Sequence, residues 1–506
     1  MSDAPLILGV SGLRGIVGES LTPEVAVRYA GAFGQWIQDQ FESWGGVVVA
    51  RDGRAGGEVI YHAVIAGLRG VGCDVLPIGV AMTPTVGVAV DENGYMGALI
   101  VTASHNPQEW NGIKGLVFKH DEDRDGKSVV ARAPSGAEAG EIIERFQGQQ
   151  NWSSAKWLGN EKRTVDAVYQ HVFKLRRAML GKQVSGQLKV VLDSVNTSGA
   201  EAAMQYLSTS SLLSERERHQ VVQLHGDGSG IFPHTPEPTK ENLSGEGGLC
   251  DAVPGLKADV GFAQDPDADR LAIVDERGEY IGEEYTLVLC AMALMEARVG
   301  QGGSGDGKPV FVVNLSTSRM IDDVAKHYGG EVVRTAVGEA NVVEAMKSLK
   351  ASGRDVVLGG EGNGGVIWPE VTYVRDSLSG MALVLSLMAR TGKTVSQLVE
   401  MINAMGPTDE VKTSGYTIIK KKSALAKKSD ADPVVQHLNA IYSQQGDCRV
   451  DLQDGIRIDW DAKGVWAHVR ASNTEPIMRV IVEAPSSDEA QAVASEIDAQ
   501  IASMGG

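Results

Sequence analysis

The sequence predicts an α/β protein of four domains, three of similar mixed α/β build and a C-terminal α+β domain. Three observations support this prediction. The chain has 506 residues, which is the length of several ordinary domains. It contains 61 glycines but only 5% aromatic residues, a composition that suits many strand-to-helix turns. One order of segments also occurs three times along the chain and is then replaced by another.

The repeated order begins at apolar strands expected at 47–50, 189–192 and 310–313. Each strand is followed by a polar turn, a helical stretch and a second apolar strand. This is the order of a right-handed βαβ unit, in which two parallel strands flank a crossover helix. Three such units predict three α/β domains.

The last hundred residues show short strand-like runs at 455–460, 464–469 and 477–483, followed by an amphipathic helix from Ser487. Strands that follow one another so closely predict an antiparallel sheet. The predicted domains cover residues 1–158, 159–282, 283–400 and 401–506.

The formal net charge of −18 argues against a role on nucleic acid or on a membrane surface, because no broad cationic face is available. A small anionic substrate, which needs only a local cluster of cations, remains possible. The four cysteines are far apart and form no CxxC pair, so we expect buried thiols in a reducing compartment. We find no signal peptide and no membrane-spanning run, and expect a cytoplasmic protein. The basic run 420–428 is interpreted as a solvated face.

Residues 101–115, VTASHNPQEWNGIKG, form the most informative segment. An apolar run, 96–101, precedes it and predicts a buried strand, so Ser104 is expected at the strand's carboxyl end, where open α/β sheets place their chemistry. A phosphorylated serine needs nearby donors and a proton shuttle, and His105 and Lys114 can supply both. The alternative is that Ser104 caps a helix and its neighbours form an ordinary turn.

Residues 264–270, QDPDADR, place three carboxylates at alternate positions, Asp265, Asp267 and Asp269. Such close anions repel one another unless a cation lies among them, and an all-oxygen set favours Mg²⁺. An EF-hand is rejected because Arg270 stands where that loop needs glycine and because strands, not helices, are expected on both sides. A solvated acidic turn remains the alternative.

Residues 359–365, GGEGNGG, leave room for a ligand around one carboxylate, Glu361, which suits the paired hydroxyls of a sugar. The spacing does not match a dinucleotide-binding fingerprint, and an ordinary turn remains possible.

Residues 469–479, VRASNTEPIMR, place Arg470 and Arg479 on either side of a polar loop. Its donors are Ser472, Asn473 and Thr474, and together with the arginines they suit a phosphate group. A polar turn between two strands, with solvated arginines, is the alternative.

These four segments, in this order, resemble the α-D-phosphohexomutase family, and the resemblance covers essentially the whole chain. It implies four domains around a central cleft. It also implies that Ser104 carries a phosphoryl group, that Lys114 is the general acid or base and that His105 supports them. The segment SGLRG at 11–15 resembles the opening motif of the family, which implies that Arg14 contacts the active-site phosphate.

The resemblance further implies that Asp265, Asp267, Asp269 and a phosphate oxygen on Ser104 bind Mg²⁺, and that Arg270 contacts the same phosphate. Ala268 replaces the usual glycine of this loop but leaves every ligand in place. The resemblance also implies two sets of contacts with the substrate. Glu361 and Asn363 would contact the sugar. Its phosphate would be bound by Arg470, Ser472, Asn473, Thr474 and Arg479.

The implied reaction interconverts hexose 1-phosphates and 6-phosphates through a phosphoserine and a 1,6-bisphosphate intermediate, with glucose or hexosamine 1,6-bisphosphate as activator. Asn363 and Asn473 favour a phosphoglucosamine mutase, and a phosphomannomutase/phosphoglucomutase is the alternative. Two other classes of protein are alternatives to a mutase, a metal-dependent sugar-phosphate phosphatase and a non-catalytic protein that binds sugar phosphates. Intact Ser104, Lys114 and aspartates argue against the binder. For the oligomeric state, the sequence is compatible with a monomer and with a homodimer.

Overall fold

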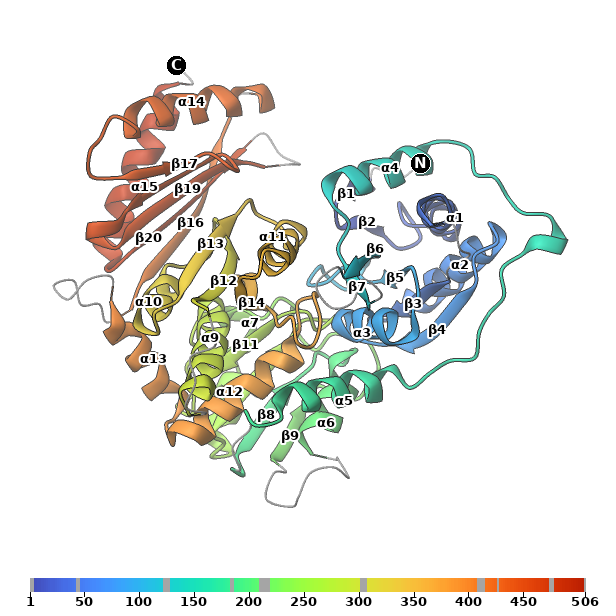
Figure 1. The fold of residues 1–506 in the computed structure, drawn as a ribbon, viewed down its shortest axis with the longest axis horizontal. Helices are drawn as coiled ribbons and strands as arrows, with labels where there is room; N and C mark the ends of the chain where they lie inside the picture. The colour runs from blue at the N-terminus through green and yellow to red at the C-terminus, as the bar shows by residue number, and fades with distance from the viewer. Residues whose placement is uncertain are drawn as a thin grey trace.

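The computed structural model describes residues 4–41, 46–121, 128–182, 186–208, 219–300, 307–406, 415–425, 427–472 and 477–504. In Figure 1 the chain follows an arc from a blue N-terminal part, through green and yellow parts, to an orange and red C-terminal sheet. Each part contains one sheet, and we number the parts domains 1 to 4 in chain order. The predicted fold class is confirmed, whereas the predicted boundaries remain predictions.

Domain 1 is built on a seven-stranded sheet. Its elements are β1 (Ile7–Gly9), β2 (Gly12–Ile16), α1 (Pro23–Gln40), β3 (Val47–Arg51), α2 (Gly57–Gly70), β4 (Val75–Val80), α3 (Thr83–Asn93), β5 (Gly97–Val101), β6 (Trp110–Asp121), β7 (Ser128–Arg132) and α4 (Gly136–Gln147).

Domains 2 and 3 are each built on a four-stranded sheet. The elements of domain 2 are α5 (Ala167–Met179), β8 (Lys189–Asp193), α6 (Gly199–Leu207), β9 (Gln220–Leu224), α7 (Lys240–Leu243), α8 (Leu249–Gly255), β10 (Val260–Gln264) and β11 (Leu271–Val274). Those of domain 3 are α9 (Glu283–Gly300), β12 (Pro309–Asn314), α10 (Met320–His327), β13 (Glu331–Thr335), α11 (Glu339–Ala351), β14 (Asp355–Glu361), β15 (Gly365–Ile367) and α12 (Ser377–Thr391), and α13 (Val395–Met405) follows.

One strand order recurs in the first three sheets, β4-β3-β5-β6, β9-β8-β10-β11 and β13-β12-β14-β15. In each, the first three strands are parallel and the fourth is antiparallel. In this strand order, the turn between the third and fourth strands therefore occupies the same place in each of the three sheets. These turns are 102–109, 265–270 and 362–364, which hold the serine, the three aspartates and the glycine-rich loop. The common topology brings the three predicted loops to equivalent strand ends.

Domain 4 has a five-stranded antiparallel sheet in the order β16-β20-β19-β18-β17. Its elements are β16 (Thr417–Ala424), α14 (Ala431–Tyr442), β17 (Arg449–Asp451), β18 (Ile456–Trp460), β19 (Val465–Ala471), β20 (Ile477–Ala484) and α15 (Ser487–Ser503). The antiparallel prediction is confirmed. The basic run 420–428 begins inside β16, an edge strand in which lysine is common because it discourages further strand pairing. Lys420 and Lys422 are exposed there, as the interpretation of a solvated face expects.

Local sequence explains where several helices begin. Thr22 accepts a hydrogen bond from the backbone of Val25 at the start of α1, and Pro23 occupies the first turn, where it removes no helical hydrogen bond. Ser135 and Glu138 form a reciprocal capping box at the start of α4. β3 and β5, two of the parallel strands, are apolar and buried on both faces over almost their whole length, as strands inside a parallel sheet require.

One fully buried hydrogen-bonded chain joins the first three domains. Thr85 Oγ1 lies 2.9 Å from His171 Nδ1, and His171 Nε2 lies 3.1 Å from Asp376 Oδ2. The three residues come from α3, α5 and the start of α12. Because these groups are shielded from water, their contacts fix how the three domains sit together. No helix in the described ranges combines the length and apolarity needed to cross a bilayer.

Candidate active site

Ser104 lies on the turn that follows β5 and is 5% exposed. Its φ is +50°, in the left-handed region that a non-glycine residue adopts only at an energetic cost. Neighbouring groups hold this conformation. The backbone N–H of Ser104 donates to Thr102 Oγ1 at 2.9 Å, and the guanidinium of Arg54 donates to the Ser104 carbonyl. The serine hydroxyl is thereby fixed in one direction.

Arg54 and Asp52 form a buried ion pair beneath this turn, with Arg54 Nε 2.9 Å from Asp52 Oδ2. The same carboxyl oxygen accepts a 2.7 Å hydrogen bond from Thr102, and Arg54 also donates to the carbonyl of Trp110. Our sequence interpretation treated 51–54 only as a polar turn. The sequence order could have indicated this contact, because the turn 51–54 follows β3, and β3 is the parallel neighbour of β5, which precedes Ser104.

His105 and Arg14 lie beside Ser104. His105 Nδ1 is 3.3 Å from Ser104 Oγ. Burial, followed by the nearby Arg270 and Arg14 guanidinium groups, lowers the pKa of His105 to about 3. The imidazole is therefore neutral at neutral pH. Arg14 donates a 2.7 Å hydrogen bond to Asn106 Oδ1, which places it on the same loop.

The three aspartates of the 265–270 turn are fully buried, and one oxygen of each lies within 4.8 Å of the others. Ser104 Oγ donates a 2.9 Å hydrogen bond to Asp265 Oδ2. Asp267 accepts a 2.7 Å hydrogen bond from Thr83, and Asp269 accepts one of the same length from Lys114. The solvated-turn alternative is wrong, since water does not reach these carboxylates.

The acidic triad suits a hard divalent cation. Asp267 Oδ1 and Asp269 Oδ1 are buried and have no hydrogen-bond partner among the described residues, an arrangement that is costly unless a ligand satisfies them. Burial and the charges of Asp267 and Asp269 raise the pKa of Asp265 well above its usual range. Oxygen donors of this kind are those that Mg²⁺ prefers.

Lys114 and Arg375 supply positive charge on the other side of the triad. Lys114 Nζ is 2.7 Å from Asp269 Oδ2 and 3.3 Å from Asp267 Oδ2. Burial alone would lower the pKa of Lys114, but these two carboxylates outweigh it and raise the pKa. Arg375 Nη2 is 2.7 Å from Asp269 Oδ2. Lys114 is therefore held as an ammonium ion.

Arg375 also connects the aspartate turn at 265–270 to the glycine-rich loop at 359–365. Its Nη1 donates to Glu361 Oε2 at 2.8 Å, and its Nε lies 3.4 Å from Glu339 Oε2. Glu361 accepts a second hydrogen bond, from Asn314 Nδ2, at 2.8 Å. Asn363 Oδ1 accepts from the backbone N–H of Gly365 at 3.2 Å. Glu361 is thus aimed at the same centre as the aspartates, and Asn363 shapes the turn.

The cradle predicted in domain 4 contains a like-charged pair. Arg470 on β19 stands directly opposite Arg479 on β20, so the two side chains lie on one face. Burial lowers the pKa of Arg470, while the Asp454 and Glu361 carboxylates oppose that effect. Arg470 is therefore close enough to interact electrostatically with Glu361 of the glycine-rich loop. Ser472 is buried at the end of β19. Asn473 and Thr474 lie outside the described residues.

Two lysines of β16 were missed by the sequence interpretation. Lys422 stands opposite Arg479, so Lys422, Arg479 and Arg470 form a row across three adjacent strands. Lys420 Nζ lies 2.5 Å from Glu283 Oε1, and the charge of Arg270 influences the pKa of Lys420. Because side chains two residues apart lie on the same face of a strand, the spacing of Lys420 and Lys422 could have shown that they share one face.

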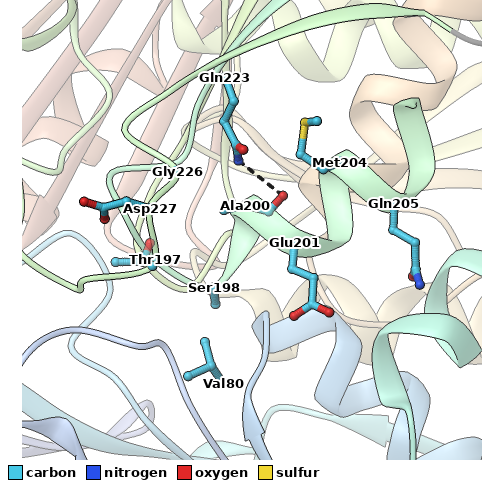
Figure 2. Close-up of a pocket in the computed structure, with 11 residues that line it drawn as sticks. Val80, Thr197, Ser198, Ala200, Glu201, Met204, Gln205, Gln223, Gly226 and Asp227 are labelled. Atoms are coloured by element: carbon cyan, nitrogen blue, oxygen red, sulfur yellow. Dashed lines mark hydrogen bonds between the residues drawn. The ribbon is translucent and has the colours of Figure 1, made fainter. Parts of the chain in front are cut away.

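A hollow lies in domain 2 and is not formed by the four predicted loops. It has a volume of about 540 Å³ between the first turn of α6 and the turn at 226–228, with Val80 on the side of domain 1. Figure 2 shows Glu201 and Asp227 at its edge and a hydrogen bond from Gln223 to the Ala200 carbonyl. Its lining, within the described ranges, includes none of the predicted site residues.

Comparison with known proteins places this arrangement in a family. Sequence models of phosphoglucomutase/phosphomannomutase match in four consecutive pieces, α/β/α domains I, II and III and the C-terminal domain, at residues 5–121, 166–278, 283–405 and 421–500. A phosphoglucomutase/phosphomannomutase from Thermococcus kodakarensis is 33% identical over 489 residues, which is 96% of each chain. The chain belongs to the α-D-phosphohexomutase family.

Two further relatives agree. A probable phosphoglucosamine mutase from Methanopyrus kandleri is 32% identical to this phosphohexomutase over 498 residues, again 96% of each chain. A solved phosphoglucomutase/phosphomannomutase family structure from Burkholderia thailandensis superposes with a TM-score of 0.76 over 98% of both chains. Its sequence identity of 23% supports the fold alone.

Proposed function

We propose that this phosphohexomutase interconverts glucosamine 6-phosphate and glucosamine 1-phosphate, with Ser104 carrying the phosphoryl group between turnovers. The observation that carries the proposal is the contact between Ser104 Oγ and Asp265 Oδ2, 2.9 Å long and shielded from water. It places a fixed hydroxyl against a buried triad of carboxylates that suits a cation. A phosphatase would have little need for the arginine pair of domain 4.

The residues divide the work as follows. Ser104 phosphate passes to the free hydroxyl of the hexose monophosphate, so the Ser104 O–P bond breaks and a sugar O–P bond forms. The sugar hydroxyl loses its proton and Ser104 gains one. Lys114 enters as a charged donor, whereas His105 enters as a neutral group whose lowered pKa makes it a weak base, which suits a supporting role beside Ser104. The bisphosphate then reorients, and its other phosphoryl group returns to Ser104.

Asp265, Asp267 and Asp269 would hold Mg²⁺, which when bound screens the negative charge of the transferring phosphoryl group. Arg14 and Arg270 would contact the same phosphoryl group, since both lie close enough to lower the pKa of His105 beside Ser104. Arg270 Nε is buried without a hydrogen-bond partner among the described residues, which leaves it free to donate to an oxyanion. A glucose or hexosamine 1,6-bisphosphate would prime Ser104.

The substrate would be held at both ends. Glu361 and Asn363 would contact sugar hydroxyls that are common to both orientations, since the sugar must bind in either direction. Arg470, Ser472, Asn473, Thr474 and Arg479 would hold the phosphate that is not reacting. Adjacent arginines provide charge and bidentate donors for such a group.

The relative named probable phosphoglucosamine mutase and the asparagines at 363 and 473 favour the amino sugar. A second candidate, phosphomannomutase/phosphoglucomutase, is favoured by the relative of that name, whose identity is 33%. The two candidates share every step at Ser104 and differ only in the sugar.

A substrate panel tests the proposal. The protein, with Mg²⁺ and a trace of glucose 1,6-bisphosphate, receives the 1-phosphates of glucosamine, N-acetylglucosamine, glucose and mannose in separate reactions. We expect the highest kcat/KM for glucosamine 1-phosphate and no release of inorganic phosphate. Preference for glucose or mannose would move the assignment to the second candidate. Release of phosphate without isomerisation would contradict a mutase.

A further inference from the structure

We propose that domain 2 contains a second metal site, separate from the acidic triad, in which Asp193, His225 and His234 bind one borderline divalent ion such as Zn²⁺. The three side chains come from the end of β8, the residue after β9 and the loop that follows. One ligand atom from each lies within 4.8 Å of the other two. Imidazole and carboxylate together suit zinc and its neighbours, whereas the oxygen-only triad suits Mg²⁺.

The cluster could hold an ion after a small expansion of a few tenths of an ångström. Asp193 Oδ2 is 3.0 Å from His225 Nδ1 and 2.9 Å from His234 Nε2. Ligands bound tetrahedrally at about 2.0–2.2 Å lie about 3.4 Å apart, which is close to these separations. The Asp193 side chain is buried, while His225 and His234 are 29% and 19% exposed. Their open side admits water as a fourth ligand.

Hydrogen-bond polarity provides a second observation. His234 Nδ1 lies 2.8 Å from the carbonyl of Thr235, and a carbonyl only accepts, so this nitrogen carries a proton. When His234 is neutral, the other nitrogen, Nε2, presents its lone pair to Asp193 Oδ2 at 2.9 Å, and a metal cation between them satisfies both groups. When His234 is protonated, the proton on Nε2 takes that place, and the metal titration below distinguishes the two cases. The carbonyl beneath Nδ1 is the outer partner that metal-binding histidines usually have.

The carboxylate is oriented in a similar way. Asp193 Oδ1 accepts a 3.0 Å hydrogen bond from the backbone N–H of Val195, which directs Oδ2 toward the histidines. The backbone around the cluster is strained, because Val195, Asn196 and His225 all have positive φ. Such conformations persist where the surroundings impose them, and a bound ion would help to do so.

The cluster lies behind the loop that contacts the phosphoserine turn. Gln108, which follows Ser104 in that turn, donates to the Gly230 carbonyl at 3.0 Å and accepts from the Phe232 N–H at 2.7 Å. Gly230 and Phe232 stand between His225 and His234 in the chain. The turn at 226–228, directly after His225, forms one wall of the hollow in Figure 2. An ion at the cluster would therefore brace domain 2 against the Ser104 loop.

Metal titration of the whole protein tests this site. The protein is first treated with chelator, then given saturating Mg²⁺ to occupy the triad, and titrated with Co²⁺ as a spectroscopic probe. We expect one equivalent with the strong visible absorption of a low-coordinate nitrogen and oxygen site. His225→Gln and His234→Gln should each abolish it. His62→Gln, on an exposed face of α2, and Asp267→Asn should both retain it.

Zn²⁺ should also raise the melting temperature of the chelator-treated wild type and of His62→Gln, but not of His234→Gln. Should the histidine variants fail to fold, Cu²⁺ bound to the wild type decides the matter by electron paramagnetic resonance. Couplings from imidazole nitrogens support the site. Absorption and melting temperatures that do not change with either histidine, or copper spectra without imidazole couplings, would overturn it.

Discussion

Ser104 Oγ and Asp265 Oδ2 are 2.9 Å apart although 161 residues separate them in the chain. The two residues lie at topologically equivalent strand ends of two different sheets, so the contact depends on how domains 1 and 2 are joined. Asp376, directly before α12, contacts His171 at 3.1 Å and ties domain 3 to domain 2. The position of the Ser104 hydroxyl therefore depends on how these domains pack together.

Arg375 should be essential for the alignment of two loops. Arg375→Lys keeps a charge but cannot reach Asp269, Glu361 and Glu339 together, because a lysine has one point donor where arginine has a planar fork. By analogy with other residues that orient metal ligands, we expect an about 10–100-fold loss of apparent Mg²⁺ affinity. The Mg²⁺ dependence of the initial rate measures it. An unchanged half-saturating Mg²⁺ concentration would show that Arg375 does not orient the triad.

Glu284 should make stability depend on pH. It lies on α9, accepts from the Ser318 N–H at 3.1 Å, and burial raises its pKa to about 8. The folded state therefore holds a proton that the unfolded state releases near pH 4.5, so Glu284 lowers stability increasingly as the pH rises from about 4.5 through 8. Glu284→Gln cannot ionise and should gain melting temperature relative to wild type over that range. A constant difference between pH 5 and pH 9 would be inconsistent with this assignment.

The arginine pair of domain 4 should respond to anions. Arg470 and Arg479 stand opposite each other, and like charges in that position destabilise a sheet by about 0.2–1 kcal/mol. In chloride buffer, Arg479→Gln should therefore unfold at the wild-type temperature or slightly above it. Phosphate should stabilise wild type more than this variant. Arg449→Gln, at the exposed far edge of the sheet, is the control and should behave as wild type. Equal stabilisation of all three would argue against a phosphate site.

The buried chain through His171 should matter for stability more than for chemistry. His171→Ala leaves Asp376 buried without its main cationic or donor partner, and breaking such a pair costs about 3–5 kcal/mol. Thr85→Val removes only one hydroxyl contact and should cost about 1–3 kcal/mol. Urea unfolding compares the two. If His171→Ala unfolds at the wild-type urea concentration, the three domains are held together elsewhere.

The sequence predicted the parts of the site that depend on local chemistry. Ser104 after an apolar strand, three alternating aspartates and two arginines around a polar loop each carry their signal within a few residues. The repeated strand order then places the first three loops at equivalent strand ends.

Contacts between distant segments were not predictable in the same way. Arg375 touches three carboxylates from three segments, and no local pattern shows that. Asp52 and Arg54 resembled an ordinary turn because their partners come from the neighbouring strand's loop. The exposure of Lys420 and Lys422 was predictable from the sequence, but the strand register that places Lys422 opposite Arg479 was not.

Peptide mapping of the phosphorylated protein tests the central claim most directly. The enzyme is incubated with glucose 1,6-bisphosphate and Mg²⁺, digested and examined by mass spectrometry. We expect one phosphoryl group on Ser104 that can be transferred to added hexose monophosphate. A folded Ser104→Ala variant should carry no phosphoryl group and should have no mutase activity. A phosphoryl group on another residue, or mutase activity that survives in Ser104→Ala, would contradict this claim.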